Sequence, residues 1–117
     1  MNILIVDDDD EQILSILEEF FKTIKQYKIS TTNTGEATVE MCKTNNYDII
    51  LLDLTLPGIN GCQVFDKIKE FNTDTKIVLA SGDIESIDLE DRQFDGYLKK
   101  PCQLKTVLST LESLFDN

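Results

Sequence analysis

The sequence predicts an α/β protein built on one parallel sheet that is covered by helices on both faces. Patterns typical of a strand and of a helix alternate five times along the chain. The strand-like segments are too apolar to leave one face in water, as is usual for parallel sheets packed on both sides. No internal repeat or low-complexity linker interrupts this alternation. We therefore expect the 117 residues to form a single domain, 1–117.

The first two strands and two helices are expected within the first 46 residues. Residues 2–7 read NILIVD, a continuous apolar run that closes on an acid. Apolar residues then recur at intervals of three and four over 13–24, with charged residues between them, which predicts an amphipathic helix. Residues 27–31, YKIST, form a shorter strand candidate, and 33–46 reads as a glycine-containing turn followed by a weaker helix.

The middle of the chain carries the most apolar strand candidates. Residues 47–54 read YDIILLDL and close on an acid, Asp53, before a loop that is rich in glycine and proline. A helix is expected over 62–71, where apolar residues lie on one side. Residues 76–81, KIVLAS, then predict another central strand.

The last part of the chain predicts one short strand between two helices of different quality. Residues 82–95 hold six acids and few apolar side chains, so we expect a short or irregular helix there. Residues 96–100, GYLKK, read as a short strand that Pro101 stops. Leucine and valine recur at helical spacing over 103–115, which predicts the closing helix.

The charge of the chain bears on its partners and its compartment. Twenty-two acids against eleven bases give a net charge of −11, which repels nucleic acid and anionic membrane surfaces. No apolar run approaches the ~20 residues needed to cross a bilayer. Because Met1 is followed at once by a strand, no signal peptide is expected. We expect a soluble, cytoplasmic protein that does not bind nucleic acid directly.

The histidine and cysteine content narrows the chemistry. Histidine is absent, which excludes Ser-His and Cys-His nucleophiles and imidazole metal ligands. Any phosphohistidine in the reaction must therefore belong to another protein. Cys42, Cys62 and Cys102 show no CxxC spacing, which favours small buried thiols over disulfides or a metal site.

Polar residues close four of the predicted strands. In open parallel sheets, binding sites form at the carboxyl ends of strands, beside the point where the strand order reverses. Each of these residues alone is compatible with an ordinary role such as a turn acid, a helix cap or a solvated lysine. Together they form a complementary set of acids, a hydroxyl and a cation. The set comprises Asp7, Asp8, Asp53, Ser81 and Lys99 or Lys100.

This set suits phosphoryl chemistry. Asp7 and Asp8 could hold a hard divalent cation, Mg²⁺ or Mn²⁺, through oxygen ligands. Asp53 could be their third acidic neighbour and a carboxylate nucleophile that forms an acyl phosphate. A lysine and a hydroxyl would then neutralise and position the phosphoryl oxygens. The next three acids, 9–11, suit the first turn of a helix, where the helix dipole favours negative charge.

Four segments resemble the signature segments of response-regulator receiver domains. They read ILIVDD, YDIILLDLTLPGINGCQV, IVLASG and GYLKKP, and they occur in the family's order over essentially the whole chain. The resemblance implies a five-stranded, flavodoxin-like three-layer sandwich with strand order 2-1-3-4-5.

The same resemblance implies roles for the residues around the phosphoryl group. Asp53 would be the phosphoacceptor, and Asp7 and Asp8 the acidic pair at the metal. The backbone carbonyl of Thr55 would be a further metal contact, and Lys100 the lysine that contacts the phosphoryl group.

Four residues are expected to act after phosphorylation. Ser81 matches the family's switch hydroxyl and Tyr97 its switch aromatic. Thr55 and Asp83 each lie two residues beyond a site residue, and we expect their side chains to set the lifetime of the acyl phosphate.

The function predicted is that of a phosphoacceptor domain in two-component signal transduction. A sensor histidine kinase or a histidine phosphotransfer protein would donate the phosphoryl group, and a downstream effector or a fused output domain would detect the change. Catalysis would be limited to Mg²⁺-dependent self-phosphorylation and self-dephosphorylation. Two alternatives remain open. One is a pseudo-receiver that acts as an interaction module, and the other is a phosphatase with an aspartate nucleophile, although Thr55 stands where that class has its general acid.

Overall fold

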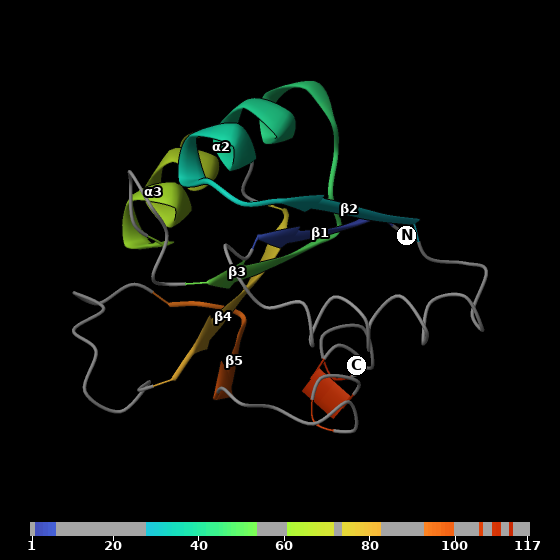
Figure 1. Ribbon diagram of the computed structural model, residues 1–117, viewed down its shortest axis with the longest axis vertical. Helices are drawn as coiled ribbons and strands as arrows, with labels where there is room; N and C mark the ends of the chain where they lie inside the picture. Colours follow the sequence, from blue (N-terminus) through green and yellow to red (C-terminus); the bar gives the residue numbers. More distant parts are fainter. Residues whose placement is uncertain are drawn as a thin grey trace.

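Five parallel strands form one sheet in the order β2-β1-β3-β4-β5, which confirms the predicted fold class and strand order. The structure is a computed structural model that describes residues 2–6, 28–53, 61–71, 74–82, 93–99, 106, 109–110 and 113. The elements in chain order are β1 (Asn2–Val6), β2 (Lys28–Thr32), α2 (Gly35–Thr44), β3 (Ile49–Asp53), α3 (Gly61–Phe71), β4 (Lys76–Ser81) and β5 (Gly96–Lys99) (Figure 1).

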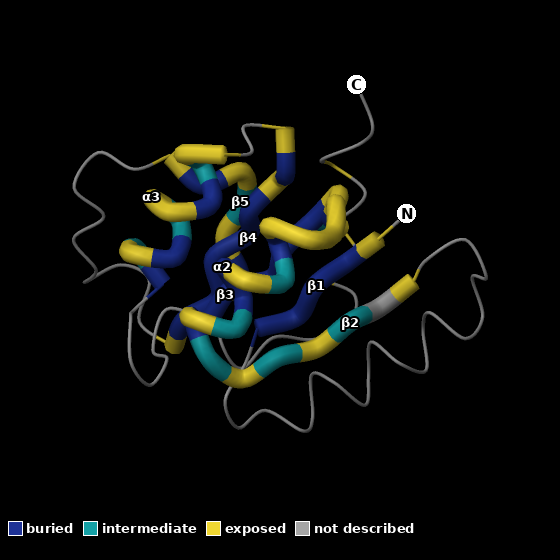
Figure 2. Tube along the Cα trace, turned by 90° about the horizontal axis from the view of Figure 1, so that it is seen from above, coloured by how far each residue is buried: buried dark blue, intermediate teal, exposed yellow. Residues whose placement is uncertain are grey.

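The three central strands are buried almost throughout, and the two edge strands are not. Every residue of β3 is buried, as is every residue of β1 after Asn2 and of β4 after Lys76. In β5 only Leu98 is fully buried, and the described side chains of β2 are exposed or half-buried. Figure 2 shows this contrast between β1 and β2. Continuous apolar runs therefore mark the strands that are covered on both faces.

Alternate residues of the central strands divide between two cores. One face packs against α2 and α3, which lie side by side in Figure 1. Because side chains alternate along a strand, each central strand contributes every second residue to this face. The cluster includes Leu4 and Val6, Ile50 and Leu52, Ile77 and Leu79 from the strands, Val39 and Cys42 from α2, and Val64 and Ile68 from α3.

The opposite face is also apolar and carries helical residues from the end of the chain. Residues 106, 109–110 and 113 are helical, within the predicted closing helix. A Cβ atom added to Gly96 would lie 3.1 Å from Cγ2 of Thr110 and 3.4 Å from a methyl group of Val78. Thr110 therefore packs against β4 and β5 on the face turned away from α2 and α3. The helices predicted over 13–24 and within 82–95 lie outside the described residues, apart from the ends of the second range.

Local sequence explains the start and the end of α2. The side chain of Thr34 caps its first turn, with Oγ1 accepting a hydrogen bond from the backbone N–H of Ala37 at 3.1 Å. The acid Glu36 lies in the first turn and Lys43 in the last, as the helix dipole favours. At the other end, the N–H of Asn45 donates to the carbonyl of Met41.

One strand begins later than its apolar pattern predicts. The expected strand over 47–54 begins only at Ile49, because Tyr47 and Asp48 make other contacts. Tyr47 is buried in the core beside α2 and α3. Asp48 hydrogen-bonds both the N–H and the carbonyl of Asn2, at the start of β1.

Candidate functional site

Two of the predicted site residues lie at the carboxyl ends of neighbouring central strands. Asp53 is the last residue of β3 and Ser81 the last residue of β4. Asp53 pairs with Ala80, so Ser81 lies one residue further toward the carboxyl edge of the sheet. Asp53 and Ser81 therefore both lie at the carboxyl edge of the sheet, on neighbouring strands.

Both residues are nearly buried, which is unusual for an aspartate. Each has a relative exposure of 7%. A carboxylate this far from water is rarely stable unless hydrogen bonds, a cation or a metal compensate its lost hydration. In the described part of the chain, no buried polar side-chain atom lacks a hydrogen-bond partner. At the carboxyl end of β3, the protein therefore keeps a polar residue largely out of water.

The first strand leads the chain to the same edge. Its last residue, Val6, pairs with Leu52, the residue before Asp53. Asp7 and Asp8 follow Val6 directly in the sequence. These two acids lie outside the described residues, as do three other predicted site residues, Thr55, Asp83 and Lys100.

Tyr97 lies on the same face of the sheet as Ser81. Ser81 pairs with Lys99, and Leu79 pairs with Tyr97. Residues paired in parallel strands share a face, and so do residues two apart along one strand. Ser81 and Tyr97 are therefore diagonal neighbours on adjacent strands. Ser81 is buried, whereas Tyr97 is 43% exposed.

A run of three aromatic rings connects Tyr97 to α3. The centroids of the Phe94 and Tyr97 rings are 6.1 Å apart, with their planes at 62°. Phe94 also contacts Phe65 of α3, with the centroids 4.5 Å apart and the planes at 45°. Phe94 is buried and belongs to the core cluster. The ring of Tyr97 thus packs against Phe94, and movement of the buried Phe94 ring would disturb the core.

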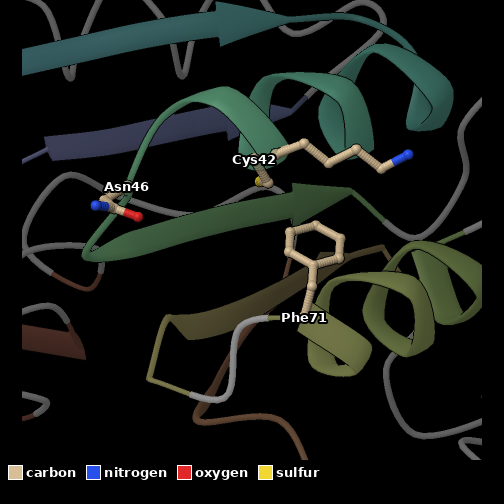
Figure 3. Close-up of a pocket in the computed structure, with 4 residues that line it drawn as sticks. Cys42, Asn46 and Phe71 are labelled. Carbon is tan, nitrogen blue, oxygen red and sulfur yellow. The ribbon is translucent and has the colours of Figure 1, made fainter.

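A surface hollow lies apart from these strand ends, near the carboxyl ends of α2 and α3. It is lined by Cys42, Lys43, Asn46 and Phe71 (Figure 3). Burial raises the pKa of the Cys42 thiol to about 11, so this thiol is protonated and unreactive near neutral pH. Cys42 is a buried free thiol, as predicted, whereas the free thiol Cys62 is only half-buried, and Cys102 lies outside the described residues.

Sequence reasoning missed two aspartates at the opposite, amino edge of the sheet. Asp48 and Asp95 directly precede β3 and β5, and each accepts a hydrogen bond from a neighbouring strand through its side chain. The sequence carries a signal for both, since each follows a buried aromatic residue, Tyr47 or Phe94.

None of the helices in the described ranges is long and apolar enough to span a membrane.

Comparison with known proteins identifies the family. Residues 3–112 match the response regulator receiver domain family. The response regulator ArlR of Staphylococcus haemolyticus is 32% identical over 115 residues, which are 97% of this chain and 52% of ArlR. The autoinducer 1 sensor kinase/phosphatase LuxN of Vibrio campbellii is 32% identical over 88% of this chain and 12% of its own length.

Solved structures agree with this match. The response regulator TrrA of Thermotoga maritima, in complex with Mg²⁺ and BeF, superposes with a TM-score of 0.81. It is 30% identical, and the match covers 97% of each chain. The present chain spans about half the length of ArlR and a small part of LuxN. The family match and these relatives show that the chain belongs to the receiver domains of two-component response regulators.

Proposed function

We propose that this receiver domain accepts a phosphoryl group on Asp53 from a phosphohistidine of a partner protein, and that the acyl phosphate changes the surface around Tyr97. The observation that carries this proposal is the position of Asp53. It is a nearly buried carboxylate at the carboxyl end of a central strand, next to the strand that ends on Ser81. Parallel sheets of this order bind their ligands at that edge.

The acidic residues around this strand end suit a divalent cation. Because Val6 pairs with Leu52, the chain enters Asp7 and Asp8 from a position next to Asp53. The carboxylates of these three residues, with the backbone carbonyl of Thr55, would provide hard oxygen donors of the kind that Mg²⁺ prefers. Mn²⁺ takes the same donors. When bound, the cation would offset the negative charge that otherwise repels an incoming phosphoryl group.

The chemistry expected of Asp53 is a single displacement. One carboxylate oxygen attacks phosphorus, the P–N bond of the donor histidine breaks, and the electron pair stays on the leaving imidazole. Lys100 follows Lys99, the residue that pairs with Ser81, and its ammonium group would neutralise a phosphoryl oxygen. Hydrolysis of the acyl phosphate resets the domain, and Thr55 and Asp83 would set its rate.

The phosphoryl group would act on Tyr97 through Ser81, its diagonal neighbour on β4. A phosphoryl group on Asp53 adds charge and acceptor oxygens, to which the Ser81 hydroxyl can donate. Movement of Ser81 toward the phosphoryl group changes the space beside Tyr97, its diagonal neighbour on β5. An effector or a fused output domain would then contact a surface with a different tyrosine position.

Two relatives support this assignment of partners and cofactor. LuxN is a sensor kinase/phosphatase that contains a segment similar to this chain. TrrA was solved with Mg²⁺ and BeF. We therefore propose a sensor histidine kinase or a phosphotransfer protein as the donor and Mg²⁺ as the cofactor. The domain would act in the cytoplasm, where such donors present their phosphohistidines.

Phosphorylation of Asp53 can be measured by intact mass after incubation with acetyl phosphate and Mg²⁺. The parent protein should gain the mass of one phosphoryl group, and Asp53→Asn should gain none. Asp48→Asn is a matched control, because Asp48 precedes the same strand at its other end and is exposed. The asparagine keeps an acceptor for the N–H of Asn2, so this variant should be phosphorylated as the parent is.

The outcomes separate the three functions that the sequence leaves open. Phosphorylation that persists in Asp53→Asn would refute the assignment of the site. A folded parent protein that gains no phosphoryl group, with and without Mg²⁺, would favour the pseudo-receiver. Continuous turnover of a phosphate ester would favour the phosphatase.

A further inference from the structure

Two aspartates form the same pair of hydrogen bonds at the amino edge of the sheet. The N–H of Asp48 donates to the carbonyl of Asn2 at 2.8 Å, and the N–H of Asn2 donates to Oδ2 of Asp48 at 2.7 Å. The N–H of Asp95 donates to the carbonyl of Ile77 at 2.9 Å, and the N–H of Ile77 donates to Oδ2 of Asp95 at 2.8 Å. Each aspartate thus binds both backbone groups of one residue on a neighbouring strand. We call this arrangement an aspartate clamp.

The Asp95 clamp lies at the start of β5, a strand with few other constraints on its register. The strand β5 has four residues and lies at the edge of the sheet, so it pairs only with β4. A short edge strand has few backbone hydrogen bonds to fix its register. The clamp adds a side-chain bond at its start, and a long contact from Lys76 Nζ to Asp95 Oδ1, at 4.0 Å, lies alongside. This contact is partly exposed, so the hydrogen bond to Ile77 is the stronger constraint.

Gly96 supplies a second and independent constraint on the same register. It lies opposite Val78, where an added Cβ would come within 3.1 Å of the Thr110 methyl group. If β5 slipped by one residue, either Asp95 or Tyr97 would bring a side chain to this position. The hydrogen bonds of Asp95 and the lack of space for a side chain at Gly96 therefore favour the same register of β5.

The register of β5 decides where the switch and lysine residues lie. A slip of one residue turns every side chain to the other face of a strand. Tyr97 would then leave the face that it shares with Ser81, and the residue after Lys99 would start from a different position. We propose that Asp95 is a positioning residue for the phosphoryl switch, which fixes the register of β5 and so the placement of Tyr97 and Lys100. This inference rests on the proposed function.

The two clamps should have separable effects. The Asp48 clamp joins β3 to β1, the strands that lead to Asp53 and to the acidic pair. The Asp95 clamp joins β5 to β4, the strands that lead to the lysine and to Ser81. Loss of the first should therefore weaken Mg²⁺ binding. Loss of the second should slow phosphoryl transfer while the affinity for Mg²⁺ stays unchanged.

The test compares Asp95→Ala, Asp95→Asn and Asp48→Ala in the full chain. Asparagine retains an acceptor oxygen for the Ile77 N–H, whereas alanine retains none. A net hydrogen bond changes a population by about twofold to tenfold. Asp95→Ala should therefore speed amide hydrogen exchange of β5 by about that factor and slow phosphorylation by acetyl phosphate to a similar extent. Asp95→Asn should stay close to the parent, and Mg²⁺ affinity from amide shifts should fall only in Asp48→Ala.

A destabilised control separates positioning from general loss of stability. Thr75→Val removes the buried hydrogen bond from Thr75 Oγ1 to the Tyr47 carbonyl, at 3.0 Å, and leaves both clamps in place. If Thr75→Val and Asp95→Ala lower the melting temperature equally, Thr75→Val should be phosphorylated faster than Asp95→Ala. Equal rates in these two variants, or unchanged exchange of β5 in Asp95→Ala, would overturn the proposal. If the parent itself is not phosphorylated, the proposed function fails, and the exchange of β5 amides still decides whether the clamp fixes the strand.

Discussion

Shortening Phe94 to alanine tests whether this ring joins β5 to α3. The ring is 7% exposed and contacts Phe65 at 4.5 Å and Tyr97 at 6.1 Å between centroids. Removal of a buried phenylalanine side chain costs about 3–5 kcal/mol when the cavity does not collapse. Phe94→Leu keeps an apolar side chain but removes two ring pairs, each worth about 0.5–1.5 kcal/mol beyond burial. The free energy of unfolding should therefore fall by about 1–3 kcal/mol in the leucine variant.

Urea unfolding followed by circular dichroism measures both losses. Phe71→Ala is the matched control, because Phe71 is 43% exposed at the end of α3 and should cost only about 1 kcal/mol. The dependence of stability on urea should stay the same in all three variants, so that the midpoints report stability directly. If Phe94→Ala costs no more than Phe71→Ala, the ring does not support β5, and the aromatic run from Tyr97 to α3 has no energetic basis.

Two residues of α2 and its cap carry the remaining predictions. The rate at which a thiol reagent labels Cys42 should rise about tenfold per pH unit between pH 8 and 10, because burial raises the pKa of this thiol to about 11. Peptide mass mapping measures this rate, and a rate that does not change with pH would refute the reasoning. Folding raises the pKa of the Cys42 thiol from 9.0, so the protonated thiol contributes its full stabilisation of the fold below pH 9. This contribution is lost as the pH rises toward 11. The melting temperature of Cys42→Ala should therefore fall less over that window than the melting temperature of the parent. Thr34→Ala should lower the free energy of unfolding by about 1 kcal/mol through loss of the cap on the Ala37 N–H, whereas Thr34→Ser should retain most of it; equal losses in urea unfolding would exclude the cap as the cause.

The fold was predictable because its strands carry a strong and local signal. Continuous apolar runs such as those around Leu4 and Ile50 can be covered only by a sheet packed on both faces. The acids and hydroxyls that close these runs fall at one edge because parallel strands all point the same way. The placement of Asp53 and Ser81 follows from these two rules.

The remainder depends on contacts between residues far apart in sequence. The pattern around Tyr47 and Asp48 reads as strand, but the aspartate binds a residue 46 positions away, and β3 begins after it. Similarly, Asp95 reads as one more acid in an acid-rich stretch until its bond to Ile77 is known. The strand order came from family resemblance, since apolar periodicity does not specify which strands are neighbours. The shared face of Ser81 and Tyr97 depends on that order and on the register.

The position of Tyr97 on an edge strand has a consequence for how receiver domains of this kind diversify. A side chain that is 43% exposed can change rotamer without opening a cavity, so such a change would cost little free energy. The residues that hold the sheet together, such as Ile50 and Leu79, are fully buried and need not move. If partners contact the exposed face of β5, as proposed, substitutions there would alter recognition at little cost to folding. The core and the exposed face of β5 can vary almost independently of each other.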